Sequence, residues 1–160
     1  MKNGGSMTAL AYTVAFEGIE ARIVEVQCAV TPGIPAFSIV GLADKAVSEA
    51  RERVRSALSS LQIALPSKRI TINLSPADMP KIGSHFDLPI ALALLAALDI
   101  IPADDAARTV ALGELSLNGD LVPVVGALPA AMAAATEDRQ LLWPLGSETP
   151  ASSHRVAWPQ

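Results

Sequence analysis

Cysteine and histidine are scarce in this sequence. Cys28 is the sole cysteine among 160 residues, so the chain can form no internal disulfide and no cysteine-based zinc site. The two histidines, His85 and His154, lie far apart, and neither has a second histidine four residues away on a helix face. A zinc site built from them would need carboxylates that this spacing does not supply. We therefore expect no metal site, and we expect Cys28 to be a small core residue.

Long apolar runs and phosphate-binding loops are also lacking. The longest apolar run, residues 88–98, has 11 residues and includes a proline, whereas a membrane-spanning helix needs about 20. The first six residues carry one charge and no apolar region, so we expect no secretory signal and a cytoplasmic location. Neither a Walker A loop nor the pattern G-x-G-x-x-G occurs. The chain by itself is therefore not expected to hydrolyse ATP.

Apolar residues, by contrast, are abundant. Hydrophobic residues make up 51% of the chain and charged residues 18%, with a mean hydropathy of +0.38. This composition excludes a disordered chain and a coiled coil. A domain of this size typically buries about 68–70% of the surface of its unfolded chain, so we expect one packed domain.

Charge is unevenly distributed along the chain. The net charge of −4 and the isoelectric point of about 5.1 argue against a nucleic-acid binder held by general basicity. Residues 45–81 nevertheless hold seven basic and three acidic side chains, whereas residues 82–160 hold three basic and nine acidic ones. One segment can therefore meet phosphate or an acidic surface, while the rest would repel it.

The hydrophobic periodicity predicts an α/β sandwich, an α+β arrangement in which helices cover a mixed sheet. Alternating or short apolar segments predict strands at 8–17, 20–30, 36–41, 69–74 and 140–144, and a hairpin over 109–124 that turns at Asn118-Gly119. Helical periodicity or continuous apolar character predicts helices at 43–62, 87–99 and 126–137. We expect the first three strands to pair antiparallel, and Asp87 to cap the second helix.

The helix predicted at 43–62 carries the clearest charged surface. Its apolar residues fall on one arc of about 120°; they are Ala46, Val47, Ala50, Val54, Ala57, Leu58 and Leu61. Arg51 and Arg55 flank this arc on one side and Arg53 on the other, with Glu49 placed to pair with Arg53. A solvated helix face is the simpler interpretation, and a contact surface for phosphate or an acidic partner is the sharper one. That candidate surface consists of Lys45, Arg51, Arg53, Arg55, Lys68 and Arg69.

The loop before the second predicted helix, Gly83-Ser84-His85, is the main candidate for chemistry. Free backbone N–H groups at a helix N-terminus can bind an anion, although every loop that enters a helix has this geometry. Ser84 could act as a nucleophile with Lys81 or His85, provided that the base lies within hydrogen-bond reach. A polar loop beside a helix start is the simpler interpretation of both features.

Five sequence motifs resemble those of the ComM/YifB family of Mg-chelatase-like AAA+ proteins. They are FSIVGLAD (37–44), EARERVRSAL (49–58), RITINLSPAD (69–78), FDLPIAL (86–92) and GELSLNG (113–119). The resemblance covers residues 8–145 in order. It implies an N-terminal domain similar in fold to the Lon protease domain and to the C-terminal domain of RadA.

The same resemblance implies the setting of this domain. Residues 1–7 would be a tag or a disordered start, and residues 146–160 a linker towards an AAA+ ATPase domain that binds ATP and Mg²⁺. The family implies a hexameric motor acting on DNA, since ComM is linked to branch migration during natural transformation. The expected partners are the ATPase domain and neighbouring subunits, with DNA as a further candidate and no membrane.

The Lon likeness also bears on catalysis. Lon-type proteases use a serine just before the buried helix and a lysine further along the chain. Matching 80–83 and 120–123 to that pattern places His85 near the serine position and Leu128 near the lysine position. No lysine follows Lys81, and arginine stays charged and cannot serve as the base.

The resemblance therefore implies a non-catalytic accessory domain that serves assembly and is a candidate for DNA contact. The alternative is a Lon-like peptidase that uses Ser84. Metal insertion into a porphyrin, which the family name suggests, would need a ligand cluster that the sequence lacks. The arginines of the contact surface have two candidate uses, DNA contact and pairing with acidic residues of a neighbouring subunit such as Asp104 and Asp105.

Overall fold

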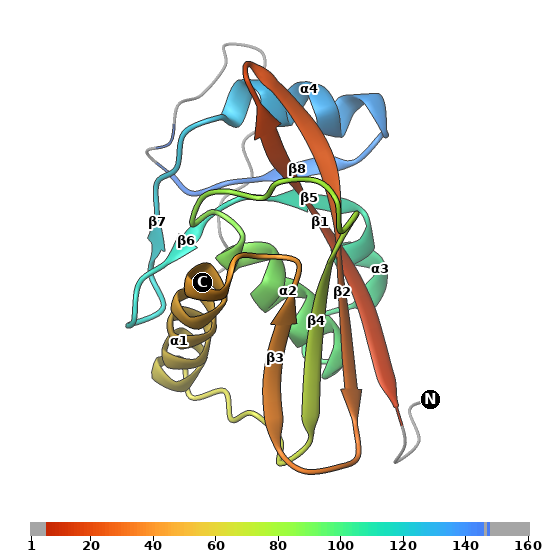
Figure 1. The fold of residues 1–160 in the computed structure, drawn as a ribbon, viewed down its shortest axis with the longest axis vertical. Coiled ribbons are helices and arrows are strands. Elements are labelled where there is room, and N and C mark those ends of the chain that lie inside the picture. The colour runs from red at the N-terminus through yellow and green to blue at the C-terminus, as the bar shows by residue number, and fades with distance from the viewer. Residues whose placement is uncertain (1–5, 146, 148–160) are drawn as a thin grey trace.

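The computed structural model describes residues 6–145 and Ser147, so the predictions for His154 and for the termini lie outside the described residues. The strands are β1 (Met7–Glu17), β2 (Glu20–Thr31), β3 (Ala36–Val40), β4 (Arg69–Ser75), β5 (Thr109–Ala111), β6 (Glu114–Leu115), β7 (Leu121–Val122) and β8 (Gln140–Leu142). The helices are α1 (Asp44–Ser60), α2 (Asp87–Ala97), α3 (Ala103–Ala107) and α4 (Ala127–Thr136). The predicted fold class, a mixed sheet covered by helices, is confirmed (Figure 1).

A six-stranded sheet in the order β3-β4-β2-β1-β5-β8 forms the centre of the molecule. Its longest part is the antiparallel β1–β2 hairpin, in which Met7 pairs with Val30 and Glu17 with Glu20. Gly18 begins the turn with a positive φ of 62°, which glycine adopts without the clash of a Cβ. In Figure 1 this hairpin runs the height of the molecule, with α1 and α2 at its lower half and α4 at its upper end.

The pairing predicted for the first three strands is wrong in one respect. β4 lies between β2 and β3, antiparallel to β2 and parallel to β3, with Cys28 opposite Ile72 and Phe37 opposite Ile70. β3 and β4 are consecutive strands joined through α1, and parallel neighbours need such a crossover. β3 therefore becomes an edge strand of the sheet, a position that matters for the charged surface described below.

One face of the sheet packs against α1 and α2. The apolar arc of α1 is confirmed, because Ala50, Val54, Ala57 and Leu58 are buried. Leu61, which was predicted to belong to this arc, follows the last helical residue and is exposed. Every residue of α2 is buried, as its continuous apolar sequence predicts. This face of the sheet and the two helices form the main core, which includes Cys28 as predicted.

A second core lies on the opposite face of the sheet, at its upper end. Val14 of β1 belongs to it, whereas its neighbour Ala15 belongs to the main core, as the alternation of side chains along a strand requires. α4 covers this second core with Ala127, Ala130 and Ala134. The sheet is thus a layer between helices on both faces, although α4 covers only part of one of them.

Two predictions for the second half of the chain need correction. β5 does not belong to a hairpin, because it pairs in parallel with β1 and β8 in the main sheet, and only β6 and β7 form the predicted hairpin. The acidic stretch after Pro102 forms the short helix α3, which the sequence analysis missed. Among the described residues, no helix is both long and apolar enough to cross a membrane.

Candidate functional site

Two arginines of α1 lie over the edge strand β3. The Nη1 atom of Arg51 donates a hydrogen bond to the carbonyl oxygen of Phe37 (3.3 Å). The guanidinium carbon of Arg55 lies 5.7 Å from the centroid of the Phe37 ring, within the range of a cation–π interaction. Charged side chains commonly protect the free edge of a sheet from pairing with another strand. The apolar face of α1 packs on the core, and these arginines lie at its margin beside β3.

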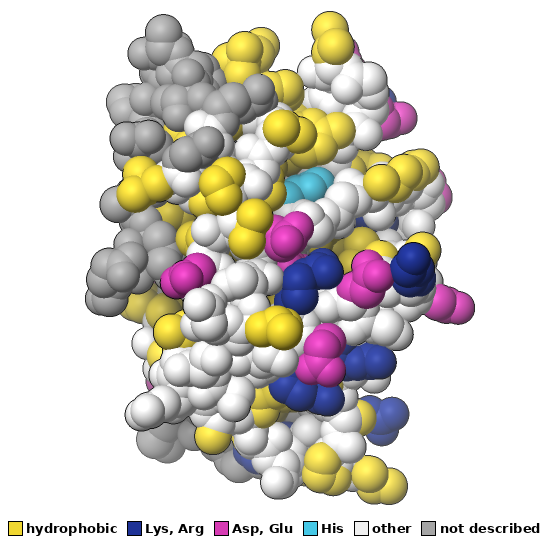
Figure 2. Space-filling model, turned by 90° about the vertical axis from the view of Figure 1, so that its left-hand side faces the viewer, with side chains coloured by type: hydrophobic (Ala, Val, Ile, Leu, Met, Phe, Trp, Pro, Cys, Tyr) yellow, Lys and Arg dark blue, Asp and Glu magenta, His cyan; other side chains and the backbone are white. Residues whose placement is uncertain are grey.

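The start of β4 carries two more cations, Lys68 and Arg69, at the end of the sheet where β3 begins. Because Ile70 faces the core under α1, Arg69 lies on the other face of the sheet. Arg69 lies opposite Ala36 of β3, and the amide of Ala36 donates to the carbonyl oxygen of Lys68 (3.4 Å). Lys45 lies in the first turn of α1 and is exposed. Figure 2, which views the side of the molecule that carries α1, shows Lys and Arg side chains interspersed with Asp and Glu. We call Lys45, Arg51, Arg55, Lys68 and Arg69 the cationic edge.

Arg53 is engaged elsewhere. Its Nε and Nη2 atoms donate to the two carboxylate oxygens of Asp87, at 2.6 and 3.1 Å. The predicted pairing with Glu49 is therefore replaced by an ion pair to a residue 34 positions away. Asp87 does not cap α2 as predicted, because its Oδ2 atom also accepts a hydrogen bond from the Leu115 amide (3.0 Å). The Arg53–Asp87 pair thus links α1, α2 and the β6–β7 hairpin.

Burial dominates the electrostatics of this pair. The Asp87 side chain is 1% exposed and the Arg53 side chain 24%. Loss of hydration raises the pKa of Asp87, and the hydrogen bonds from Arg53 and Leu115 oppose this effect without cancelling it. The pKa of Arg53 is raised, chiefly by its hydrogen bond to Asp87. A fork-shaped guanidinium is suited to this two-bond contact with a carboxylate.

The loop Gly83-Ser84-His85 is built around a buried histidine. The Nε2 atom of His85 lies 2.7 Å from the carbonyl oxygen of Val14, so the ring donates its proton there. The His85 ring packs against Phe16 and Phe86, with centroids 5.3 and 4.2 Å away. Burial lowers the pKa of His85, which favours a neutral ring.

Ser84 lies beside a cavity of about 230 Å³ between α1 and the loop. Its lining includes Glu49, Arg53, Ser84 and Asp87. Lys81 Nζ donates to the carbonyl oxygens of Pro76 and Met79. Within the described part of the chain, no hydrogen bond joins Ser84 to Lys81 or His85. Ser84 therefore shares a cavity with the Arg53–Asp87 ion pair and is not hydrogen-bonded to either candidate base among the described residues.

The position matched to the Lon lysine lies on α4. Leu128 is there, and its side chain is exposed. Phe16 fills the space between His85 and the start of α4, because a Cβ added to Gly126 would collide with the Phe16 ring. The side chains at and between the two matched positions are therefore apolar or aromatic.

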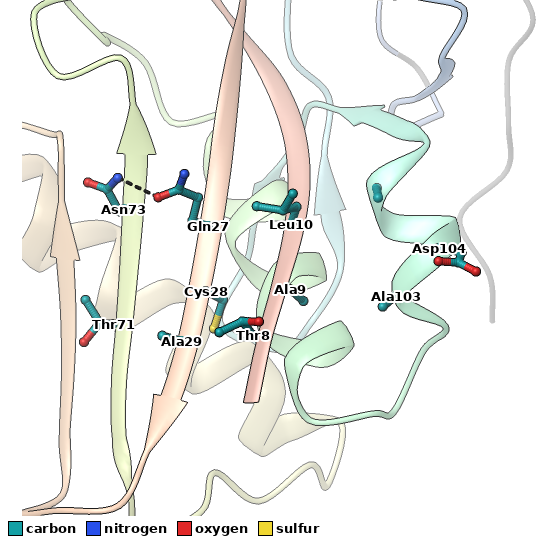
Figure 3. Close-up of a pocket in the computed structure, with 11 residues that line it drawn as sticks. Thr8, Ala9, Leu10, Gln27, Cys28, Ala29, Thr71, Asn73, Ala103 and Asp104 are labelled. Carbon is teal, nitrogen blue, oxygen red and sulfur yellow. Dashed lines mark hydrogen bonds between the residues drawn. The ribbon is translucent and has the colours of Figure 1, made fainter. Parts of the chain in front are cut away.

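A second cavity, of about 610 Å³, lies on the part of the sheet that α4 leaves uncovered. Figure 3 shows Gln27 and Asn73 meeting across neighbouring strands, where Asn73 Nδ2 donates to Gln27 Oε1 (2.9 Å), with Asp104 of α3 on the other side. This surface was not predicted from the sequence. The signal that could have located it is Gln27, a polar residue between the buried Val26 and Cys28 on β2. In residues 6–145 and Ser147, no three His, Cys, Asp or Glu side chains gather closely enough to share a metal ion.

Comparison with known proteins gives the family. A family model described as subunit ChlI of Mg-chelatase matches residues 24–147. The competence protein ComM of Haemophilus influenzae is 45% identical over 134 residues, which cover 84% of this chain and 26% of ComM. The uncharacterized protein YifB of Escherichia coli is 41% identical over 133 residues, covering 83% of this chain and 26% of YifB.

An uncharacterized protein of Mycobacterium tuberculosis is also similar, with 44% identity over 124 residues that cover 78% of this chain and 25% of that protein. The chain thus spans about a quarter of the length of the curated relatives it matches. The family model matches well over half of the chain. The chain therefore belongs to the family of the ChlI subunit of Mg-chelatase, in the group that includes ComM and YifB.

Proposed function

We propose that this chain is an accessory domain, without catalytic chemistry of its own, of a longer AAA+ ATPase of the ComM type. The relatives are about four times as long as the region they share with this chain. Because this sequence lacks a Walker A loop, ATP and Mg²⁺ would be held by another part of such a protein. The domain would serve the assembly of a hexameric motor that moves branched DNA during competence.

The observation that carries the proposal is the environment of His85. A Lon-type serine must be free to attack and must lie near a lysine that can lose its proton. His85, at the matched position, is buried and bonded to the carbonyl of Val14, and Leu128 stands at the position of the lysine. Ser84 lacks a base partner among the described residues, because Lys81 is engaged by backbone carbonyls. These contacts support a fold that is used for binding rather than for hydrolysis.

The second part of the proposal is that the cationic edge contacts DNA phosphate. Arg51 and Arg55 are both held beside Phe37, so less side-chain freedom is lost when they bind a phosphate. The mixed charges in Figure 2 and the net charge of −4 imply a weak contact that depends on salt. Such a contact suits a domain that guides DNA while another part of the protein moves it.

The test is titration of the chain into fluorescently labelled single- and double-stranded DNA at low and at physiological salt. The informative variant is Arg51→Ala/Arg55→Ala. Arg22→Ala/Arg108→Ala is the matched control, because it removes the same charge from two exposed arginines on other elements. We expect affinity that falls with salt, a loss of at least about tenfold in the first variant and a smaller loss in the control.

Two results would contradict this part of the proposal. Equal losses in the two variants would mean that only net charge matters. Absence of binding at low salt would exclude DNA contact by this domain, and the arginines would then be assigned to a neighbouring subunit. Cleavage of a peptide substrate that disappears in Ser84→Ala would contradict the non-catalytic role itself.

A further inference from the structure

The outer surface of α4 is unusual for a helix at the surface of a domain. Residues 121–136, which contain the whole helix and the segment before it, carry no charged side chain. α1, by comparison, has seven charged residues among its 17. A helix that packs on a core with one face normally presents polar residues on the other, whereas a helix that is apolar on all sides is typical of a covered one.

Four large apolar side chains of this region are exposed. Leu128 and Met132, one helical turn apart, are 49% and 64% exposed, and residues with this spacing are neighbours on a helix. Val125, just before the helix, is 80% exposed. Leu145 is 61% exposed, and it lies two residues before Ser147, whose hydroxyl accepts a hydrogen bond from the Val124 amide (3.0 Å). We call Val125, Leu128, Met132 and Leu145 the α4 face.

The apolar surface extends beyond the helix. In Figure 2, hydrophobic side chains lie above the histidine and to both sides of it, in the upper half of the molecule, the half that contains α4 in Figure 1, and an acidic side chain lies below it. Phe16 links His85 to the start of α4 through its contacts with both. Contiguous exposed apolar patches on soluble proteins mark interaction sites.

We propose that the α4 face is the docking surface for the ATPase region of the same polypeptide. This inference rests on the proposed function, which places such a region in a longer chain. Ser147, at the C-terminal end of the described residues, accepts a hydrogen bond from the amide of Val124, the neighbour of Val125, so this end of the described domain lies beside the α4 face. A segment tethered so close to its docking surface has a high effective concentration there.

The composition of the face favours this occupant over DNA or a transient partner. Permanent interfaces resemble a domain core cut in half and are more apolar than transient ones. A DNA-binding surface would need cations, and residues 121–136 have none. The cationic edge lies on α1 and at the start of β4, in the lower half of Figure 1, so the two surfaces can be occupied at the same time.

The test compares amide hydrogen exchange in the 160-residue chain and in the full-length protein. We expect the amides of residues 128–136 to exchange at least tenfold more slowly in the full-length protein. Leu128→Asp/Met132→Asp in the full-length protein should abolish that extra protection. The matched control is Ile34→Asp/Ile100→Asp, which changes two exposed isoleucines away from α4 and should retain the protection.

ATP hydrolysis by the same full-length sample separates the two proposals. An active ATPase in which residues 128–136 exchange as fast as in the 160-residue chain would overturn the docking surface alone. A full-length protein without ATPase activity would overturn the proposed function. Protection that already occurs in the 160-residue chain and rises with its concentration would assign the face to a second copy and overturn this inference. The comparison of hydrogen exchange between the wild-type full-length protein and the 160-residue chain tests the docking surface even if the double variant fails to fold.

Discussion

Replacement of Arg53 by alanine should destabilise the domain by leaving the Asp87 carboxylate buried without its partner. Breaking a buried ion pair in this way costs about 3–5 kcal/mol. Because Arg53 is 24% exposed and borders the cavity beside Ser84, water can reach part of the carboxylate once the arginine is removed. We therefore expect the lower end of this range, a loss of about 3 kcal/mol in the free energy of unfolding. At about 2–4 °C per kcal/mol for a domain of this size, Tm should fall by about 6–12 °C.

The pH dependence of this loss tests its cause. Burial raises the pKa of Asp87 above its usual value in the wild type, and removal of Arg53 raises the pKa further. Between the pKa of Asp87 in the unfolded state and its higher pKa in the folded state, the folded state binds a proton that the unfolded state has released. The free energy of unfolding therefore falls as pH rises through this interval. The stability deficit of Arg53→Ala should therefore be largest near neutral pH and should shrink in acid, where Asp87 is protonated.

The free energy of unfolding is measured by urea titration for the wild type, for Arg53→Ala and for Arg53→Met/Asp87→Asn. In the double variant, the amide oxygen of the new asparagine can still accept the hydrogen bond from Leu115, and no charge is buried. We expect this double variant to recover most of the stability that Arg53→Ala loses. A loss below about 1 kcal/mol in Arg53→Ala, or a loss that is the same at all pH values, would refute the importance of the ion pair.

Other groups give independent tests. Burial raises the pKa of the Cys28 thiol to about 12, so at about pH 8 a disulfide reagent should react only after unfolding, and rapid labelling of the native chain would contradict this placement. Burial lowers the pKa of His85, so the folded state loses stability as pH falls below about 6.5. His85→Gln, which can still donate to the Val14 carbonyl, should lose less stability in acid than the wild type, and equal losses would contradict this. Gly126→Ala should lower stability by about 1 kcal/mol or more, because Phe16 must move and φ at this position is 100°; an unchanged Tm would argue against that packing.

Much of the fold could be predicted from periodicity along the chain. α1 and α2 follow from an apolar arc and from a continuous apolar run, and β1 and β2 follow from alternation. The position of β4 between β2 and β3 could not be predicted, because strand order depends on how a crossover helix packs and not on local sequence. The short helix α3 was missed because five residues carry too little periodic signal.

The site was predictable only in part, for the same physical reason. Spacing along α1 correctly separates Arg51 and Arg55 from Arg53, since they flank opposite sides of its apolar arc. The partner of Arg53 lies 34 residues away, beyond the reach of any helix rule, so Glu49 was the natural but wrong choice. The role of Asp87 was misjudged similarly, because a carboxylate at a helix start suits a cap unless a distant arginine and a hairpin amide claim it.

Photocrosslinking from α1 shows whether DNA contacts the cationic edge. Ser48 is exposed and lies one turn from both Lys45 and Arg51, so a photoreactive amino acid at this position reports what touches the cationic edge. Ile100, which is exposed on the turn after α2, is the control position. With labelled branched DNA and the full-length protein, we expect a protein–DNA adduct from position 48 that high salt abolishes, and little or none from position 100. Equal DNA labelling at both positions, or none at either, would contradict it.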